Sequence, residues 1–254
     1  MNARELVEYL SRGIVLRRRL PREFGRIPIY VSPEAALRYW LRMSDVDPML
    51  YHMARELVQP NCVVWDVGAN VGLFSFCAAH RAGSSGFVLA LEPDLWLAQL
   101  IARSARLADR NGIAPVRILP AAASDSNRVS HLQIARRSRA ANYIAESQGT
   151  SQADGTRYTQ ETMTVTLDFL MDYFPMPAVL KIDVELHEAR VLAGARKLLR
   201  AARPIIWCEV SPENSQAVTD LLHSENYNLY SAAEPPSERS VITKAHWHTL
   251  ALPK

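Results

Sequence analysis

Residues 62–76 read Cys-Val-Val-Trp-Asp-Val-Gly-Ala-Asn-Val-Gly-Leu-Phe-Ser-Phe, and this stretch decides the fold. It opens with an apolar run to Trp65 that predicts a buried parallel strand, which Asp66 closes. Gly68 and Gly72 supply a turn in which no side chain obstructs a ligand. From Leu73 onward the apolar residues repeat at helix spacing. Strand, turn and helix start together present free backbone N–H groups to a nucleotide-like ligand.

The turn also indicates which nucleotide binds. A dinucleotide site uses Gly-x-Gly-x-x-Gly, so that the backbone can touch a pyrophosphate. Here Asn70 stands where the middle glycine would be, and the acid Asp66 precedes the turn, which suits a ligand with a charged amino-acid end and no pyrophosphate. A second apolar run, residues 87–91, ends in Glu92, about 20 residues beyond the last glycine, where an acid accepts hydrogen bonds from both ribose hydroxyls. The two stretches together predict S-adenosylmethionine.

A third stretch carries a specific resemblance. Residues 180–185 read Leu-Lys-Ile-Asp-Val-Glu, which resembles the Lys-Ile-Asp-Val-Glu-Gly signature of the FkbM family of methyltransferases. Three further motifs match the pattern of that family in the same order: Asp66–Gly72, Glu92–Asp94 and Thr166–Asp168. The resemblance covers roughly residues 45–215. Leu186 stands where the family usually has glycine, and we expect it to narrow the space beside the strand end.

The resemblance implies a fold, a cofactor and an activity. The fold is α/β, with a doubly wound, mostly parallel sheet of seven strands, Rossmann-like and of the class I methyltransferase type, whose last strand is antiparallel. The enzyme is expected to be an S-adenosylmethionine-dependent methyltransferase. Its expected reaction is O-methylation of a hydroxyl on a sugar, glycolipid, polyketide or similar natural product. The preference for oxygen and for these acceptors comes from the resemblance alone.

The 254 residues suffice for one sizeable core, so we expect a helical N-terminal extension over residues 1–44 and the methyltransferase domain over 45–254. Six arginines lie between residues 12 and 26. We interpret them as a solvated helix end and linker, although they could instead touch phosphate or an acidic membrane surface.

Beyond Glu92, helices are predicted over residues 95–109, closed by Asn111-Gly112, and over 186–201. The polar residues 126–163 predict a long flap on the substrate side, with Asn142 and Tyr143 as contacts. Ala122 and Ala123 follow the strand at 116–119, where small residues leave room for adenine but are also common in turns.

Ligands of such sheets bind at the carboxyl ends of the strands, so the acids there are the candidate site residues. An acceptor alcohol loses its proton during transfer, and a base within reach contributes to the rate. Asp183 is the first candidate for this base, Glu185 the second and His187 the third. Glu209, at the end of the next strand, is assigned to the substrate. The predicted cofactor-binding residues are Asp66, Gly68, Asn70, Gly72, Glu92, Pro93, Asp94, Ala122 and Ala123.

The amino-acid composition restricts which partners the protein can have. A formal net charge of +3 does not demand nucleic acid, and the three cysteines lack metal-site spacing and indicate reduced core residues. The sequence shows neither a secretory signal nor an apolar run that could span a bilayer, so we expect a cytoplasmic protein. We predict no metal and a small-molecule or glycan acceptor. A homodimer is compatible with the sequence.

Two other functions stay open. Arginines at 12–26 and 136–139 raise the alternative of an RNA methyltransferase, although no aromatic residues for base stacking alternate with them. The other is a cofactor-binding protein that has lost its activity. The intact Asp183 and Glu185 argue against that alternative, while Leu186 keeps it open.

Overall fold

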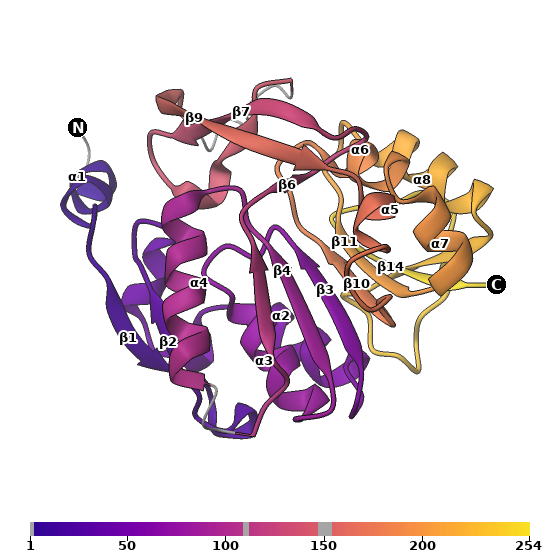
Figure 1. Ribbon diagram of the computed structural model, residues 1–254, viewed down its shortest axis with the longest axis horizontal. Helices are drawn as coiled ribbons and strands as arrows, with labels where there is room; N and C mark the ends of the chain where they lie inside the picture. The colour runs from indigo at the N-terminus through magenta and orange to yellow at the C-terminus, as the bar shows by residue number, and fades with distance from the viewer. Residues whose placement is uncertain (1–2, 109–111, 147–153) are drawn as a thin grey trace.

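The computed structural model describes residues 3–108, 112–146 and 154–254, and an eight-stranded sheet lies at the centre of this part of the chain (Figure 1). The strand order is β13-β12-β14-β11-β10-β3-β4-β5. The bounds are β3 Val63–Val67, β4 Phe87–Leu91, β5 Val116–Leu119, β10 Val179–Ile182, β11 Ile205–Glu209, β12 Tyr227–Ser231, β13 Val241–Ile242 and β14 His248–Pro253.

The topology is that of a doubly wound sheet. Strands β5, β4, β3, β10 and β11 run parallel, whereas β14 is antiparallel to both β11 and β12. The chain proceeds outward from β3 to β5 on one side and from β10 on the other, so the topological switch point lies between β3 and β10. The predicted mostly parallel sheet with an antiparallel last strand is confirmed, and the two-residue strand β13 is added at one edge.

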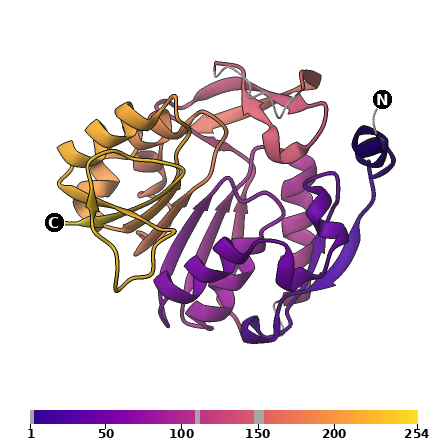
Figure 2. The same ribbon diagram turned by 180° about the vertical axis from the view of Figure 1, so that it is seen from behind.

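Helices cover both faces of this sheet (Figures 1 and 2). The helices α2 (Pro48–Leu57), α3 (Leu73–Ala82) and α4 (Leu95–Ala108) pack on one face. On the other lie α5 (Leu167–Leu170), α6 (Glu188–Ala193), α7 (Arg196–Ala202) and α8 (Ser215–Ser224). Alternate residues of a strand serve the two cores: Val64 belongs to the first and Trp65 to the second. Asp66 therefore faces α3.

The helix predicted over residues 186–201 is in fact two helices. The break between α6 and α7 lies at Gly194, where an added Cβ would come within 2.0 Å of the Ser124 carbonyl oxygen. The Gly194 carbonyl also accepts a hydrogen bond from Asp168 N at 2.9 Å. The segment that contains Ser124 passes close to Gly194 and interrupts the helix. An apolar pattern with helical spacing does not reveal such a contact. The helix predicted over 95–109 is α4, and Asp109 and Asn111 lie outside the described residues.

The polar segment 126–163 contains a second sheet instead of an irregular flap. Strand β7 (Arg128–Ala135) pairs antiparallel with β9 (Thr156–Val165), and β8 (Tyr143–Ile144) and β6 (Ala122–Ala123) complete the order β6-β9-β7-β8. The Ser-, Gln- and Gly-rich stretch 147–153 lies outside the described residues. Figure 1 shows this sheet across the end of the central sheet at which α4 begins, which is the carboxyl edge.

The N-terminal segment 1–44, predicted to be helical, contains one α-helix, α1 (Ala3–Leu10), and also a two-stranded antiparallel sheet. Its strands are β1 (Leu16–Arg19) and β2 (Pro28–Val31), and the remaining helical turns are the 3₁₀-helices η1 (Arg22–Phe24), η2 (Leu37–Trp40) and η3 (Met43–Asp45). Tyr30 N donates to Ser104 Oγ at 2.8 Å, which fixes β2 on α4. Most arginines of the basic cluster thus lie on a β-hairpin.

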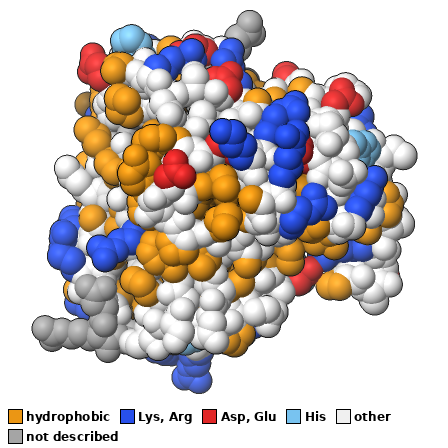
Figure 3. Space-filling view, turned by 45° about the vertical axis from the view of Figure 1, so that its right-hand side comes forward, with side chains coloured by type: hydrophobic (Ala, Val, Ile, Leu, Met, Phe, Trp, Pro, Cys, Tyr) orange, Lys and Arg blue, Asp and Glu red, His pale blue; other side chains and the backbone are white. Residues whose placement is uncertain are grey.

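The short α5 leaves aromatic and apolar side chains on the surface: Phe169, Tyr173 and Met176 are exposed. Figure 3, in which the right-hand side of Figure 1 comes forward, shows hydrophobic side chains gathered on one part of this face and Lys and Arg side chains on another.

Candidate active site

A cavity of about 870 Å³ lies at the carboxyl edge of the central sheet. Its walls come from the ends of β3, β4, β10 and β11, from the second sheet, and from the N-terminal segment. Twelve of the predicted site residues line it: Gly68, Asn70, Glu92, Pro93, Ala122, Ala123, Asn142, Tyr143, Asp183, Glu185, His187 and Glu209. The predicted Asp66, Gly72 and Asp94 do not.

The glycine turn needs its glycines for backbone reasons. Gly68 and Gly72 have φ of +78° and +81°, and Asn70 also adopts a left-handed conformation with φ of +55°. A Cβ on Gly68 would lie 1.9 Å from the Asp183 carbonyl oxygen, so the end of β10 packs directly against the turn. Gly72 begins α3, outside the cavity wall.

Glu92 connects this turn to β4. Its Oε2 accepts from Asn70 N at 2.7 Å and its Oε1 from Asp94 N at 2.9 Å. Burial, followed by the charge of Asp94, raises the pKa of Glu92 to about 8. Asn70 Oδ1 is buried, and no described residue donates to it. A ligand with hydroxyl and amino groups would donate hydrogen bonds to the side chains of both Glu92 and Asn70. S-adenosylmethionine carries such groups.

Asp66 acts from behind the cavity wall. It is fully buried, accepts a hydrogen bond from Ser75 Oγ of α3, and lies 3.0 Å from Lys181 Nζ. Lys181 also donates to the Gly68 carbonyl at 2.9 Å and lies 3.3 Å from Asp183 Oδ2. Burial lowers the pKa of Lys181, but Asp66 and Asp183 outweigh it and the pKa is raised. Asp66 thus holds a charged lysine that fixes the turn and Asp183.

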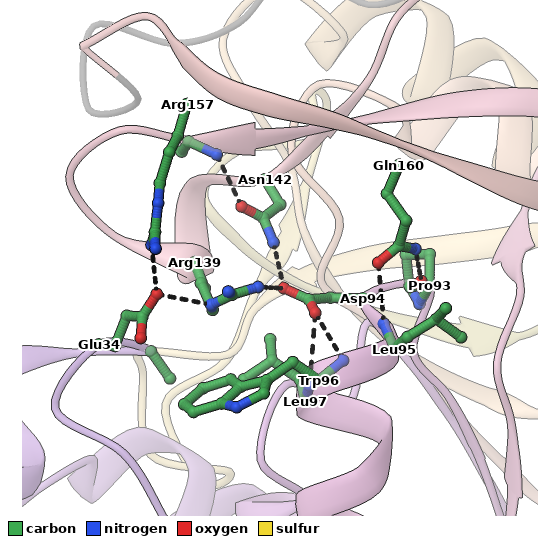
Figure 4. Close-up of polar contacts among 12 residues, drawn as sticks. Glu34, Pro93, Asp94, Leu95, Trp96, Leu97, Arg139, Asn142, Arg157 and Gln160 are labelled. Atoms are coloured by element: carbon green, nitrogen blue, oxygen red, sulfur yellow. Dashed lines mark hydrogen bonds and ion pairs between the residues drawn. The ribbon is translucent and has the colours of Figure 1, made fainter. Parts of the chain in front are cut away.

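Asp94 is likewise structural. Its Oδ1 accepts from Trp96 N and Leu97 N at the start of α4, and its Oδ2 accepts from Arg139 and from Asn142 Nδ2 (Figure 4). It is fully buried. These contacts use the carboxylate completely, so that it caps a helix and fastens the second sheet to it.

Arg139, on η4 (Arg139–Ala141), joins three segments. It is buried, donates to Glu34 Oε1 of the N-terminal segment at 2.9 Å, and lies over the Trp96 ring at 4.7 Å (Figure 4). Arg157 donates to the same Glu34 oxygen at 2.7 Å. Arg137 pairs with Glu8 at 3.1 Å. Two of the arginines that suggested RNA binding are therefore engaged inside the protein.

Three carboxylates, those of Asp183, Glu185 and Glu209, line the cavity where β10 and β11 end. Asp183 has a 40 % exposed side chain. Burial, then the charge of Asp183, raises the pKa of Glu185 to about 7 and that of Glu209 to about 8. His187 Nε2 is hydrogen-bonded to Ser124 Oγ at 2.9 Å, and burial, then Arg190, lowers the pKa of His187 to about 4. The imidazole is thus neutral at pH 7.

Several lining residues were not predicted from the sequence. Arg38 lies 2.9 Å from Asp47 Oδ2, and both line the cavity together with Trp247 and His248. Asp47 also caps α2, because its Oδ1 accepts a hydrogen bond from Leu50 N at 3.1 Å. No local pattern separates these residues from surface residues, because the fold alone brings them to the sheet edge.

Leu186 does not line the cavity, so it does not narrow the pocket as we expected. Its φ is +56°, in the left-handed region. The family glycine at this position is explained by the backbone, since glycine alone adopts that conformation without steric cost.

Within the described part of the chain, no group of three or more histidine, cysteine, aspartate or glutamate side chains is arranged to hold a metal ion. Nor does any helix there combine the length and apolar character needed to cross a membrane.

The model of the methyltransferase FkbM domain matches residues 66–229. The chain belongs to the FkbM methyltransferase family. This match confirms the resemblance of the sequence motifs and identifies S-adenosylmethionine as the cofactor. No curated protein matches the sequence.

Comparison with solved structures finds similar chains of low sequence identity. The methyltransferase FkbM of Methylobacillus flagellatus is 13 % identical with a TM-score of 0.50, over 80 % of this chain and 50 % of that chain. The chain thus spans about half the length of that relative. A precorrin-6Y C5,15-methyltransferase of Geobacter metallireducens is 12 % identical (TM-score 0.47), over 84 % and 91 %. A methyltransferase of Geobacter sulfurreducens is 13 % identical (TM-score 0.46), over 88 % and 91 %.

Proposed function

We propose that this protein is an S-adenosylmethionine-dependent O-methyltransferase for a hydroxyl of a sugar, glycolipid, polyketide or similar natural product. The observation that carries the proposal is that one cavity combines the turn-and-Glu92 arrangement with the carboxylates Asp183, Glu185 and Glu209. The volume of about 870 Å³ leaves space for an acceptor beside the cofactor.

The cofactor half of the cavity has a defined set of holding groups in this proposal. Glu92 accepts from the ribose hydroxyls, Asn70 Oδ1 accepts a donor of the ligand, and the small side chains of Ala122 and Ala123 accommodate adenine. When bound, the cofactor supplies an electrophilic methyl group on a sulfonium. Asp66 keeps the turn in position through Lys181.

The acceptor half provides a proton acceptor. Glu185 is half-buried, and its pKa of about 7 is well matched to accepting the proton of an alcohol near neutral pH. The Lys181 ammonium, 3.3 Å away, partly neutralises Asp183, which suits it to orienting the hydroxyl by accepting its hydrogen bond. We therefore propose Glu185 as the base and Asp183 as the orienting group, reversing the order that the sequence alone favoured.

Kinetics of two isosteric variants test these roles. Glu185→Gln should lower kcat by about 10²–10⁴-fold, the usual contribution of a general base, and leave the Kd of the cofactor unchanged. Asp183→Asn should mainly raise the KM of the acceptor. The opposite pattern would restore Asp183 as the base, and normal turnover of both variants would direct attention to His187.

The acceptor is found by product analysis. The full chain is incubated with methyl-labelled cofactor and fractionated extract, and the labelled product is identified by mass spectrometry, with Glu185→Gln as control. Methyl ether on a small molecule or glycolipid is the expected product. Label in RNA would support the alternative of an RNA methyltransferase, and cofactor binding without transfer to any fraction would support a protein without activity.

A further inference from the structure

Helix α1 carries its apolar side chains on its outer side. Leu6, Val7, Tyr9 and Leu10 are between 42 % and 63 % exposed, whereas Glu8 between them is buried. Glu8 lines the cavity and pairs with Arg137 at 3.1 Å. A surface helix of a globular protein ordinarily turns its apolar stripe toward the core and its charges toward water. Among the side chains of α1 that the structure describes, those of residues 6–10, this orientation is reversed.

A second segment extends the exposed apolar area. Trp40 at the end of η2 donates from Nε1 to Ser11 Oγ at 3.1 Å, which places its ring beside the end of α1. Trp40 and the following Leu41 are 43 % and 56 % exposed. We define the N-terminal apolar surface by six residues: Leu6, Val7, Tyr9, Leu10, Trp40 and Leu41.

Arginines flank this surface. Arg12 lies over the Tyr9 ring at 4.9 Å and donates to the Arg136 carbonyl at 3.1 Å. Arg136 is exposed, as is Arg42, which follows Leu41. None of these three guanidinium groups forms an ion pair with an acid among the residues that the structure describes. The surface is thus apolar at its centre and positively charged at its rim.

We propose that the N-terminal apolar surface docks on an anionic lipid bilayer. Exposed leucines with a tryptophan and a tyrosine match the boundary between headgroups and acyl chains, where amphipathic aromatic rings bind well, and the rim matches negative headgroups. Both ribbon views show α1 projecting at a corner of the molecule, away from the central sheet, a shape suited to insertion into a soft surface (Figures 1 and 2).

The same segments line the cavity. Besides Glu8 of α1, residues Leu37, Arg38 and Tyr39 of η2 contribute to its wall, next to Trp40 and Leu41. Docking would therefore bring the cavity to the lipid surface, and the acceptor best placed to enter is a hydroxyl on a lipid-linked molecule. This choice of acceptor rests on the proposed function, whereas docking itself does not.

Vesicle co-sedimentation of the full chain tests docking. We expect binding to vesicles of phosphatidylcholine mixed with phosphatidylglycerol, little binding to phosphatidylcholine alone, and weaker binding as salt is raised. Leu6→Glu with Leu10→Glu should abolish binding. Met176→Glu, an equally exposed apolar position after α5, should bind like the parent. Arg42→Gln and Arg136→Gln should each weaken binding about fivefold, whereas Lys197→Gln should not.

Other results would overturn the inference. Equal sedimentation of the parent and Leu6→Glu/Leu10→Glu proteins would exclude this surface. A dimer in light scattering that the same double variant dissociates would mean that a second copy covers it. Label transfer into the water-soluble fraction alone would refute the lipid-linked acceptor while leaving the proposed methyltransferase function intact. Transfer to no fraction by a vesicle-binding protein would refute the proposed function and leave docking intact.

Discussion

The ammonium of Lys181 determines much of the site at the scale of single residues. It contacts Asp66, the Gly68 carbonyl and Asp183, so one buried charge orders the cofactor turn, the wall behind it and the acceptor side. Such a lysine is tolerated in a strand because its carboxylate partners offset the cost of burying its charge. Asp66 therefore acts on the site through Lys181 and does not itself line the cavity.

We expect Glu92→Ala to weaken S-adenosylmethionine binding by about 3 kcal/mol, because the hydrogen bonds of Glu92 to the ligand and to Asn70 N are lost. Titration calorimetry measures the change. Glu92→Gln is the matched control. It retains the size of the side chain but only one acceptor oxygen, so its affinity should fall between those of the parent and of Glu92→Ala. Unchanged affinity of the alanine variant would remove Glu92 from the site.

Leu186 offers a test of backbone strain. We expect Leu186→Gly to be more stable than Leu186→Ala by about 1 kcal/mol, because both lose the same half-buried side chain while only glycine relieves the left-handed φ of +56°. Urea unfolding of the two variants measures the difference. At an ordinary helix position the alanine variant is more stable than the glycine variant. Greater stability of Leu186→Ala than of Leu186→Gly would therefore contradict a strained backbone at residue 186.

At the scale of elements, the second sheet is held above the central sheet by the buried network around Arg139. We expect Arg139→Met to cost about 3–5 kcal/mol in the free energy of unfolding, because Asp94 and Glu34 would retain buried charges without their main partner. Arg157→Met is the control. Its side chain is partly exposed and should cost about 1 kcal/mol or less. Similar losses in urea unfolding for both variants would show that the network is not the main fastening.

The elements also show what sequence can predict. Strand β3, its turn and α3 were predictable because their apolar spacing and glycines directly reflect burial and φ. Strand β9 was not, since Thr156–Val165 is largely polar and lacks the apolar alternation expected of a strand, and in its partner β7 the apolar alternation is limited to Leu132 and Ile134. Most of the predicted site residues line the cavity because the carboxyl ends of parallel strands meet at one edge of the sheet. The inward roles of Asp66 and Asp94 depended on Lys181 and Arg139, whose positions no local pattern reveals.

At the scale of the whole molecule, three acids that line the cavity couple stability to pH. The pKa values of Glu92, Glu185 and Glu209 are raised from 4.5 to about 8, 7 and 8, so the folded protein binds more protons than the unfolded chain between these limits. Their contribution is therefore full at low pH and is lost as pH rises toward 8. The lowered pKa of His187 acts in the opposite direction, but only between about 4 and 6.5.

We accordingly expect the Tm of the ligand-free protein to fall between pH 6.5 and 8.5. Each acid contributes up to about 1.4 kcal/mol per pH unit. Thermal unfolding monitored by circular dichroism at a series of pH values measures this, and Glu92→Gln should show a shallower decline than the parent. A Tm that stays constant over the same interval would mean that these carboxylates are already ionised in the folded protein.

The place of β14 has a consequence for synthesis. This strand, near the end of the chain, lies between β11 and β12 in the interior of the sheet. Until residues 248–253 leave the ribosome, β11 and β12 each keep a row of unpaired backbone groups, the kind of edge that pairs with other chains. The sheet therefore cannot close before residues 248–253 have emerged. A nascent polypeptide stalled before His248 should depend on chaperones far more than one from which residues 248–253 have emerged.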